Sequence, residues 1–301
     1  EDLAKTDAIA CKVLEKIKQK GVELQNYLDT TIYFGLKTGL NAAFIIDDTI
    51  KNDLLSQDEK NATLIHPYVL GDDIRKYTIN YRDRYLILIP KGWTINQIGK
   101  NTSQDEAWDW FSSNYASLAE HLFPFKEKAI RRSDQGDYWW ELRACEYYEE
   151  FKKPKILYPD IAKESRITLD TTGFYTTNTI YFIPSDDLYL LGLLNSKMIF
   201  EYYKYVASVL GDANKGGRLR WFRQDVLKLP IRTIDFDNPD DKAKHDKMVT
   251  LVQSMLALHK QLPELSGQAK KVVEQQIAKT DNDIDTLVYQ LYDLTPEEIV
   301  I

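Results

Sequence analysis

Residues 32–46 read I-Y-F-G-L-K-T-G-L-N-A-A-F-I-I. Two short runs of β-branched and aromatic residues lie on either side of a turn that contains two glycines. Similar runs recur along the chain between Gly, Pro, Asn and Asp, a pattern typical of strands. They do not alternate regularly with long helices, which favours an α+β fold over a doubly wound one. We therefore expect a mixed, largely antiparallel sheet domain with packed helices. The expected strands are residues 31–34, 42–46, 85–90, 155–158 and 179–184.

Apolar residues at helical spacing predict the remaining elements. Ser103 and Glu106 have the spacing of a capping box, and Asn238-Pro239 that of a helix cap and first helical residue. After this second cap the chain reads as an all-α C-terminal helical hairpin, followed by a short helix that begins at Thr295-Pro296. The expected helices are residues 7–26, 106–122, 188–209 (closed by Gly211), and two long segments on either side of residues 263–267.

These elements divide the chain into three parts. Residues 1–30 form a helix and linker, residues 31–232 the sheet domain, and residues 233–301 a helical C-terminal subdomain. The first residue is not Met, and the opening residues already lead into a helix. We therefore expect the chain to be a fragment of a larger protein.

Composition places the chain among globular proteins of an aqueous compartment. It has 301 residues, of which 44% are hydrophobic and 28% charged. No apolar run approaches the roughly 18 residues of a membrane span. Two distant cysteines, Cys11 and Cys145, provide neither a disulfide framework nor a cysteine zinc site. We expect a cytoplasmic protein with no membrane partner.

The net charge of −7 is unevenly distributed. Residues 233–301 contain thirteen Asp and Glu against seven Lys, so the rest of the chain is almost neutral. Clusters of basic residues in the sheet domain are compatible with binding of a polyanion, although clusters of this kind also occur on ordinary solvated surfaces. The clusters are Lys126, Lys128, Arg131 and Arg132; Lys152, Lys153 and Lys155; and Lys215, Arg218, Arg220 and Arg223.

Common catalytic motifs are missing. In the opening turn Lys37-Thr38 precede the second glycine, whereas a phosphate-binding Walker loop places them after it. The N-P-P-[YF] motif with which amino-methyltransferases hold an extruded base does not occur. The four histidines lack metal-ligand spacing, and no (D/E)-x-K follows Asp160 on a plausible strand, as a nuclease would need. We expect no catalytic residues, no metal site and no cofactor in this chain.

Arginines and aromatic residues are interleaved at two places. D-Y-W-W-E-L-R (137–143) puts two tryptophans beside charged residues, and L-R-W-F-R (219–223) repeats the mixture. Arginine can hold phosphates, and aromatic rings can stack on bases and sugars. Tryptophan is also a common core residue, and we expect at least one of Trp139 and Trp140 to be buried.

An ordered series of motifs resembles a known family. The series is G-L-K-T-G-L-N-A-A-F-I-I, H-P-Y-V-L-G-D-D-I-R-K-Y, Y-L-I-L-I-P, W-W-E-L-R, K-P-K-I-L-Y-P-D-I, N-T-I-Y-F-I, L-L-G-L-L-N-S-K and L-P-I. From about residue 33 to residue 231 it resembles the TaqI-like C-terminal specificity domain. This domain is the target-recognition region of type IIG restriction-modification enzymes and related adenine-specific DNA methyltransferases. Residues 284–301 look like the tail that often ends such proteins.

The resemblance implies a parent protein in which a DNA adenine N6-methyltransferase, and often a nuclease, precedes this chain. The parent would use S-adenosylmethionine, and Mg²⁺ if the nuclease is present. The implied partners of the chain are double-stranded DNA and the methyltransferase domain of the same polypeptide. Residues 35–41 would be the family's turn between the first strands of the recognition sheet.

Eleven residues are the predicted DNA contacts. Lys37, Thr38 and Asn41 lie in the opening turn, which could equally be a purely structural hairpin. Phosphate contacts are expected from Lys37, Lys126, Arg131, Arg132 and Lys155, and base contacts from Arg75, Arg143, Arg218 and Arg220.

Two alternative functions remain open from the sequence. One is a protein-interaction module of a multi-subunit phage-defence complex, using the acidic residues 242–294. The other is a hydrolase with an unrecognised site.

Overall fold

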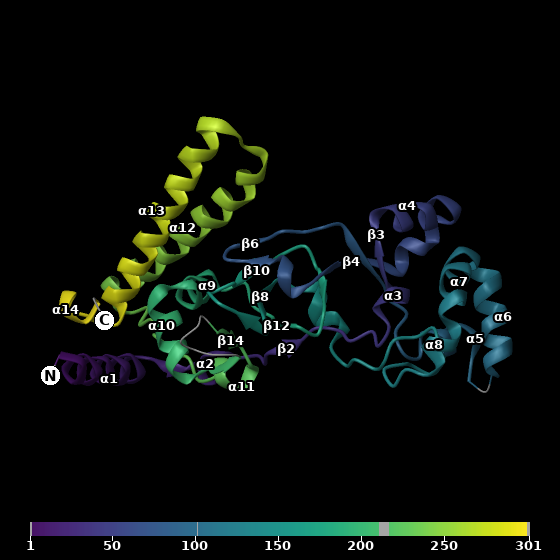
Figure 1. Ribbon diagram of the computed structural model, residues 1–301, viewed down its shortest axis with the longest axis horizontal. Helices are drawn as coiled ribbons and strands as arrows, with labels where there is room; N and C mark the ends of the chain where they lie inside the picture. The colour runs from purple at the N-terminus through teal and green to yellow at the C-terminus, as the bar shows by residue number, and fades with distance from the viewer. Residues whose placement is uncertain (1, 101, 211–216, 300–301) are drawn as a thin grey trace.

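Apolar side chains gather in two separate cores along an elongated molecule (Figure 1). The computed structural model describes residues 2–100, 102–210 and 217–299. The first core lies among α1, α9, α10, α12 and α13, and the second among α3–α8. The helices are α1 (Asp2–Lys20), α2 (Leu24–Tyr27), α3 (Asn41–Phe44), α4 (Asp48–Gln57), α5 (Trp93–Ile98), α6 (Gln104–Asn114), α7 (Ala116–Leu122), α8 (Lys126–Ile130), α9 (Leu188–Asn195), α10 (Lys197–Val206), α11 (Arg223–Val226), α12 (Pro239–Gln261), α13 (Gly267–Leu291) and α14 (Pro296–Ile299).

Short sheets connect the cores, and nearly all of their strand pairs are antiparallel. A four-stranded sheet has the order β10 (Thr168–Asp170), β8 (Lys155–Pro159), β12 (Ile180–Ile183), β2 (Tyr33–Phe34). A second has the order β11 (Tyr175–Thr176), β4 (Ile65–Val69), β7 (Arg84–Ile87), β3 (Ile45–Asp47), with only β11 and β4 parallel. The smaller sheets are β13 (Ser208–Leu210), β14 (Arg218–Arg220) and β9 (Ile161–Ala162); β1 (Val22–Glu23) and β15 (Pro230–Ile231); and β5 (Ile74–Arg75) and β6 (Thr78–Ile79).

The sheet that contains β8 and β12 has a core on each face. Successive side chains of a strand point to opposite faces. Accordingly, Ile156 and Tyr158 belong to the first core, whereas Leu157 between them belongs to the second. Phe182 and Ile183 of β12 divide in the same way. This explains why these strands are continuous apolar runs, as is usual for strands buried on both faces. The predicted α+β class with a mixed, largely antiparallel sheet is confirmed.

Four predicted elements are interrupted in the structure. The expected helix 7–26 ends at Lys20, and the strand β1 separates it from the short helix α2. Residues 42–46 were expected as one strand, but they begin as the helical turn α3 before β3. The expected helix 106–122 breaks at Tyr115, and the expected helix 188–209 breaks at Ser196, whose side chain caps α10. Gly211, the expected end of that helix, lies outside the described residues. The apolar spacing continues through these breaks, so it does not reveal where one helix ends and the next begins.

The C-terminal helices follow the prediction closely. α12 and α13 pack as an antiparallel hairpin that extends from the body of the molecule (Figure 1). The Ser103–Glu106 capping box is present in α6, and Thr295 and Glu298 hydrogen-bond reciprocally at α14. The first core draws on all three predicted parts of the chain, because Val22 in β1 pairs with Ile231 in β15 and α12 packs on α9. No helix in the described ranges is long and apolar enough to cross a membrane.

Replacing Asn238 by alanine should lower the free energy of unfolding by about 1 kcal/mol. Its side-chain oxygen accepts hydrogen bonds from the backbone N–H groups of Asp240 (2.9 Å) and Asp241 (3.3 Å) at the start of α12. Urea unfolding followed by circular dichroism measures the change. Asp237→Ala, one residue earlier and exposed, should cost clearly less, and equal losses would contradict the capping role.

Candidate nucleic-acid interface

Backbone contacts hold the opening turn in place. Gly35 lies so close to the neighbouring chain that a Cβ atom there would be 2.0 Å from the carbonyl oxygen of Thr177. Gly39 has a φ of +69°, in the left-handed region that glycine adopts without strain. The turn links β2 to β3 of another sheet, so it is not a hairpin between neighbouring strands. The two glycines therefore serve chain packing.

Lys37 leaves this turn and shares an acidic partner with Arg143. The ammonium of Lys37 lies 3.0 Å from Asp134 Oδ2, and the guanidinium of Arg143 lies 3.2 Å from Asp134 Oδ1. Burial opposes ionisation of Asp134, but its hydrogen bonds to both cations keep its pKa below the usual value. The side chains of Lys37 and Arg143 remain 53% and 44% exposed. The pair is thus held in place yet open to a ligand.

Aromatic side chains adjoin this pair. Phe34 in the edge strand β2 is 40% exposed, and the hydroxyl of Tyr147 donates to its carbonyl oxygen at 3.1 Å. The rings of Phe34 and Tyr147 meet edge to face with centroids 6.2 Å apart. A hollow of about 230 Å³ lies between them, Lys37 and Arg143. Cationic and aromatic groups therefore surround one shallow depression.

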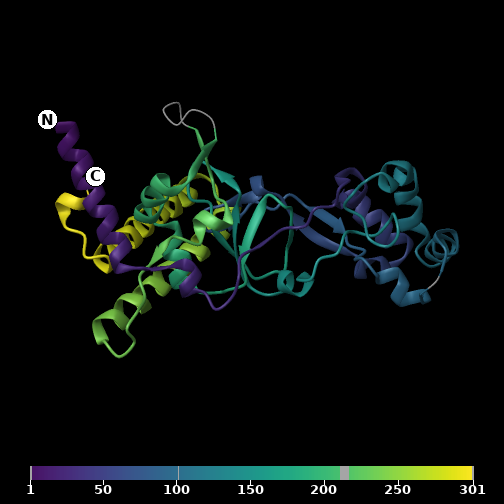
Figure 2. The ribbon, with the colours of Figure 1, turned by 90° about the horizontal axis from the view of Figure 1, so that it is seen from below.

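Two further arginines, Arg220 and Arg223, lie close together in the sequence, and Arg223 contacts the start of the same segment. Arg223 donates to the hydroxyl of Thr31 at 2.7 Å, two residues before β2. Arg220 in β14 lies over the ring of Phe222, 5.3 Å from its centroid, and pairs across the sheet with Ile161. Figure 2, seen from below, shows the purple segment around β2 crossing between the two halves of the molecule. We call this region the β2 surface: Thr31, Phe34, Lys37, Arg143, Tyr147, Arg220 and Arg223.

Three of the predicted contacts, Lys155, Thr38 and Arg132, have buried side chains that are bonded within the protein. Lys155 is 0% exposed, with its ammonium 2.5 Å from Asp170 and 2.6 Å from the carbonyl oxygen of Phe151. Thr38 is 1% exposed and its hydroxyl donates to Asn41 Oδ1 at 2.6 Å. Asn41 is exposed but is engaged in this turn.

Arg132 is the third buried prediction, at 8% exposed. It donates to the carbonyl oxygens of Thr38, Trp139 and Glu141. Burial lowers the pKa of its guanidinium to about 10, so it stays charged at neutral pH. Its role is to hold the opening turn against residues 139–141, both of whose tryptophans are buried.

The other predicted residues are spread over the molecule. Arg75 donates to the carbonyl oxygens of Asp72 and Ile74 in the β5–β6 hairpin, beside β10 and β8. This is the side of the four-stranded sheet opposite β2. Lys126 lies over the ring of Phe123, and Arg131 is exposed at the end of α8. Arg218 is exposed on β14, and Lys215 lies outside the described residues.

Of the eleven predictions, the structure brings Lys37 and Arg143 together around Asp134 and places Arg218 and Arg220 on β14. Sequence reasoning did not select Phe34, Tyr147 or Arg223 as contacts. The run L-R-W-F-R already contained Arg223, but its proximity to Thr31 depends on tertiary packing.

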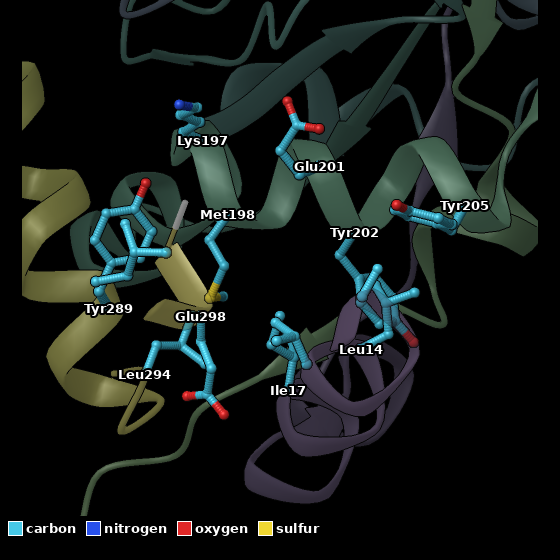
Figure 3. A pocket seen from close by; sticks show the side chains of 13 residues that line it. Leu14, Ile17, Lys197, Met198, Glu201, Tyr202, Tyr205, Tyr289, Leu294 and Glu298 are labelled. Atoms are coloured by element: carbon cyan, nitrogen blue, oxygen red, sulfur yellow. The ribbon is translucent and has the colours of Figure 1, made fainter. Parts of the chain in front are cut away.

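Other candidate sites fit a polyanion less well. A cavity of about 250 Å³ between α1, α10 and α14 (Figure 3) is lined largely by apolar side chains such as Ile17 and Met198. The carboxylates of Glu201 and Glu298 at its border would repel phosphates. Across the described ranges, no three His, Cys, Asp or Glu side chains group so that they could hold a metal ion.

Two known proteins resemble part or most of the chain. At 27% identity, 127 residues match the type II restriction enzyme and methyltransferase RM.Eco57I of Escherichia coli, covering 42% of the chain and 13% of that protein. At 21% identity, 274 residues match the type II methyltransferase M.BstVI of Geobacillus stearothermophilus, covering 90% of the chain and 40% of that protein. The chain thus spans less than half the length of either relative.

A solved structure shares the fold. The type IIL restriction-modification enzyme MmeI, determined in complex with DNA, superposes with a TM-score of 0.58 and 16% identity. The match covers 90% of this chain and 34% of MmeI. In addition, the sequence model of the TaqI-like C-terminal specificity domain matches residues 66–231, which is more than half of the chain. The match runs from β4 to β15 and leaves out only Ile65, the first residue of β4. The chain therefore belongs to the TaqI-like C-terminal specificity domain family.

Proposed function

We propose that the chain is the DNA target-recognition part of a type II restriction-modification enzyme. It reads a short asymmetric sequence and positions the duplex for an adenine N6-methyltransferase domain of the same polypeptide. Family membership supports recognition as the role, and the two relatives are a restriction enzyme and methyltransferase and a methyltransferase. S-adenosylmethionine, and Mg²⁺ if a nuclease is present, would serve the other domains of the same polypeptide.

The β2 surface carries this proposal. Its cations lie at both ends of the segment from Thr31 to Lys37, whose six residue steps span at most about 20 Å. The major groove of DNA is about 12 Å wide, so cations at the two ends can contact the backbones on either side of it. Lys37 and Arg223 then set the position through phosphates, and Arg143 and Arg220 have the fork geometry that reads guanine.

Asp134 suits this role because it holds two cations without burying them. A free lysine or arginine loses rotamer entropy when it contacts a phosphate. The ion pairs with Asp134 already restrict Lys37 and Arg143 in the free protein. The carboxylate also repels phosphates, so DNA has to displace part of this interaction.

Lys37→Gln should weaken binding to all duplexes alike and reduce the slope of log K against log salt by about 0.9, the value for one lost phosphate contact. Fluorescence anisotropy with a random duplex pool, at several salt concentrations, measures both. Lys279→Gln, on α13 and far from β2, is the matched control because its side chain is 78% exposed.

The same titration tests the function itself. Salt-independent binding, or none, by the unaltered chain would contradict DNA recognition and favour a protein-interaction module. An unchanged slope for Lys37→Gln, with binding intact, would instead remove only this residue from the interface.

A further inference from the structure

Phe34 is a large apolar side chain in the middle of the β2 surface. It lies three residues after Thr31 and three residues before Lys37. Arg223 contacts Thr31 at one end of this segment, and Lys37 carries the charge at the other end. Phe34 is 40% exposed, so an apolar surface lies open between two groups of cations.

The position of Phe34 in the sheet explains why its ring is not enclosed. The preceding residue, Tyr33, stacks on buried Phe182 of the second core with ring centroids 5.5 Å apart. Phe34 follows on the opposite face of the strand, where Tyr181 is its partner on β12. Because β2 is the edge strand of its sheet, its outer side has no neighbouring strand within the part of the chain that the structure describes.

Neighbouring groups hold Phe34 in place before any ligand binds. Its carbonyl oxygen accepts a hydrogen bond from the hydroxyl of Tyr147 at 3.1 Å, and the backbone N–H of Gly35 donates to the carbonyl oxygen of Ile180 at 2.9 Å. The rings of Phe34 and Tyr147 meet edge to face. A phenyl ring that is supported on one side offers only its free side to a ligand.

The hollow beside Phe34 has a lining of mixed charge. Arg143 contributes a guanidinium, and Glu146 contributes a carboxylate that would repel a phosphate. Burial raises the pKa of the Cys145 thiol, so this group of the lining is neutral at pH 7. Base edges are uncharged and carry both donors and acceptors, so they suit this lining better than a phosphate does.

The major groove of DNA offers one kind of apolar group to an exposed ring. Base edges there present hydrogen-bond donors and acceptors, and thymine adds its 5-methyl group. With the cations at the two ends of the segment on the two DNA backbones, the middle of the segment faces the base edges. Phe34 occupies this middle position, so a thymine methyl group is the partner that matches its chemistry.

We propose, resting on the proposed DNA recognition, that Phe34 makes the recognised sequence specific for thymine at one position. Its ring packs against the 5-methyl group of that thymine, beside a guanine that Arg143 reads. Any other base would place an amino group or a carbonyl oxygen against the ring, where it finds no hydrogen-bond partner. Phe34 is thus a specificity-determining residue.

Deoxyuridine tests this contact, because it keeps the hydrogen-bonding edge of thymine and lacks only the methyl group. The 301-residue chain first selects duplexes from a random pool, which gives its preferred sequence. Each thymine of that sequence is then replaced singly by deoxyuridine, and fluorescence anisotropy measures binding. We expect one replacement to weaken binding about fourfold, which corresponds to the roughly 0.8 kcal/mol of one buried methyl group.

Variants assign the effect to Phe34. Phe34→Ala should weaken binding and give equal affinity for thymine and deoxyuridine at this position, because the methyl group has lost its partner. Phe34→Leu keeps an apolar side chain and should retain part of the preference. Phe236→Ala, before α12 and 61% exposed, is the matched control and should leave the fourfold ratio unchanged. Circular dichroism and thermal unfolding check that each variant is folded.

The outcomes separate the thymine contact from DNA recognition. If the unaltered chain binds no duplex, or selects no sequence, both are overturned. A selected sequence in which no deoxyuridine weakens binding overturns only the contact with Phe34. A deoxyuridine effect that persists in Phe34→Ala does the same. So does equal affinity for thymine and deoxyuridine together with a DNA bend that is lost in Phe34→Ala, which would make Phe34 a wedge between bases.

Discussion

Asp170→Ala is expected to lower the free energy of unfolding by about 3–5 kcal/mol, because it leaves a buried ammonium without its counter-charge. Lys155 is 0% and Asp170 2% exposed, and their charged atoms lie 2.5 Å apart. Asp170 also accepts hydrogen bonds from the backbone of Thr172 (2.8 Å) and Phe174 (2.9 Å), which fixes the loop after β10. Urea unfolding followed by circular dichroism measures the loss.

Two variants set the scale for this effect. Asp283→Ala breaks an exposed pair with Lys279 on α13 and should cost less than about 1 kcal/mol. The double variant Lys155→Met with Asp170→Leu removes both charges and should recover much of the loss. A cost for Asp170→Ala as small as that for Asp283→Ala would show that Lys155 finds water or another acceptor.

The Asp170→Ala variant should also become relatively more stable as the pH rises. Burial already lowers the pKa of Lys155, although Asp170 opposes this, so loss of Asp170 lowers the pKa further. Between the lowered pKa in the folded state and the ordinary value in the unfolded state, the unfolded chain binds more protons, and stability therefore increases with pH. Unfolding curves from neutral to alkaline pH, compared with those of the unaltered chain, measure this trend.

Gly35→Ala should lower the free energy of unfolding by about 3 kcal/mol, at the upper end for overpacking. Its Cβ atom would lie 2.0 Å from the carbonyl oxygen of Thr177 and 2.4 Å from that of Thr176. Both obstacles are backbone atoms, and the backbone N–H of Leu36 donates to Thr176 at 2.7 Å, so neither side can move without losing this contact. Thermal and urea unfolding measure the cost.

Gly71→Ala is the matched control for Gly35→Ala. Its nearest neighbour would be the hydroxyl of Thr179 at 3.2 Å, which can rotate away, and its φ is not positive. We expect a loss below about 1 kcal/mol. If Gly35→Ala and Gly71→Ala lower the free energy of unfolding equally, the close approach of residues 176–177 is not the reason why position 35 needs glycine.

Local signals in the sequence predicted the helices well where polar caps accompany them. Asn238-Pro239 and the Ser103–Glu106 box begin α12 and α6 as expected. Ser196 was harder to interpret because it lies in a run of apolar residues, and its capping hydrogen bond to Ile199 forms only once the chain has turned. The strands β8 and β12 could be predicted from composition, but the sequence did not show that each of their faces meets a different core.

The contact residues were harder to predict than the fold. The predicted contacts rest on residue type alone. Residue type does not distinguish Lys155, whose charge is balanced by Asp170 inside the protein, from Lys37, which remains half exposed. That difference depends on Asp170 and Asp134, which are distant in the sequence from the lysines they bind. The resemblance to the family indicates DNA target recognition as the role of the chain. Only the tertiary structure shows which basic side chains are buried and which remain accessible to a ligand.

The six tryptophans are unequally divided between the two cores. Trp139 and Trp140 are buried in the second core, Trp93, Trp108 and Trp110 pack against it, and only Trp221 belongs to the first. Intrinsic fluorescence of this protein therefore reports mainly on one half of the molecule. Melting of the helical hairpin would change the emission little, whereas far-UV circular dichroism would record the loss of helix. Disagreement between the two signals would therefore reveal stepwise unfolding.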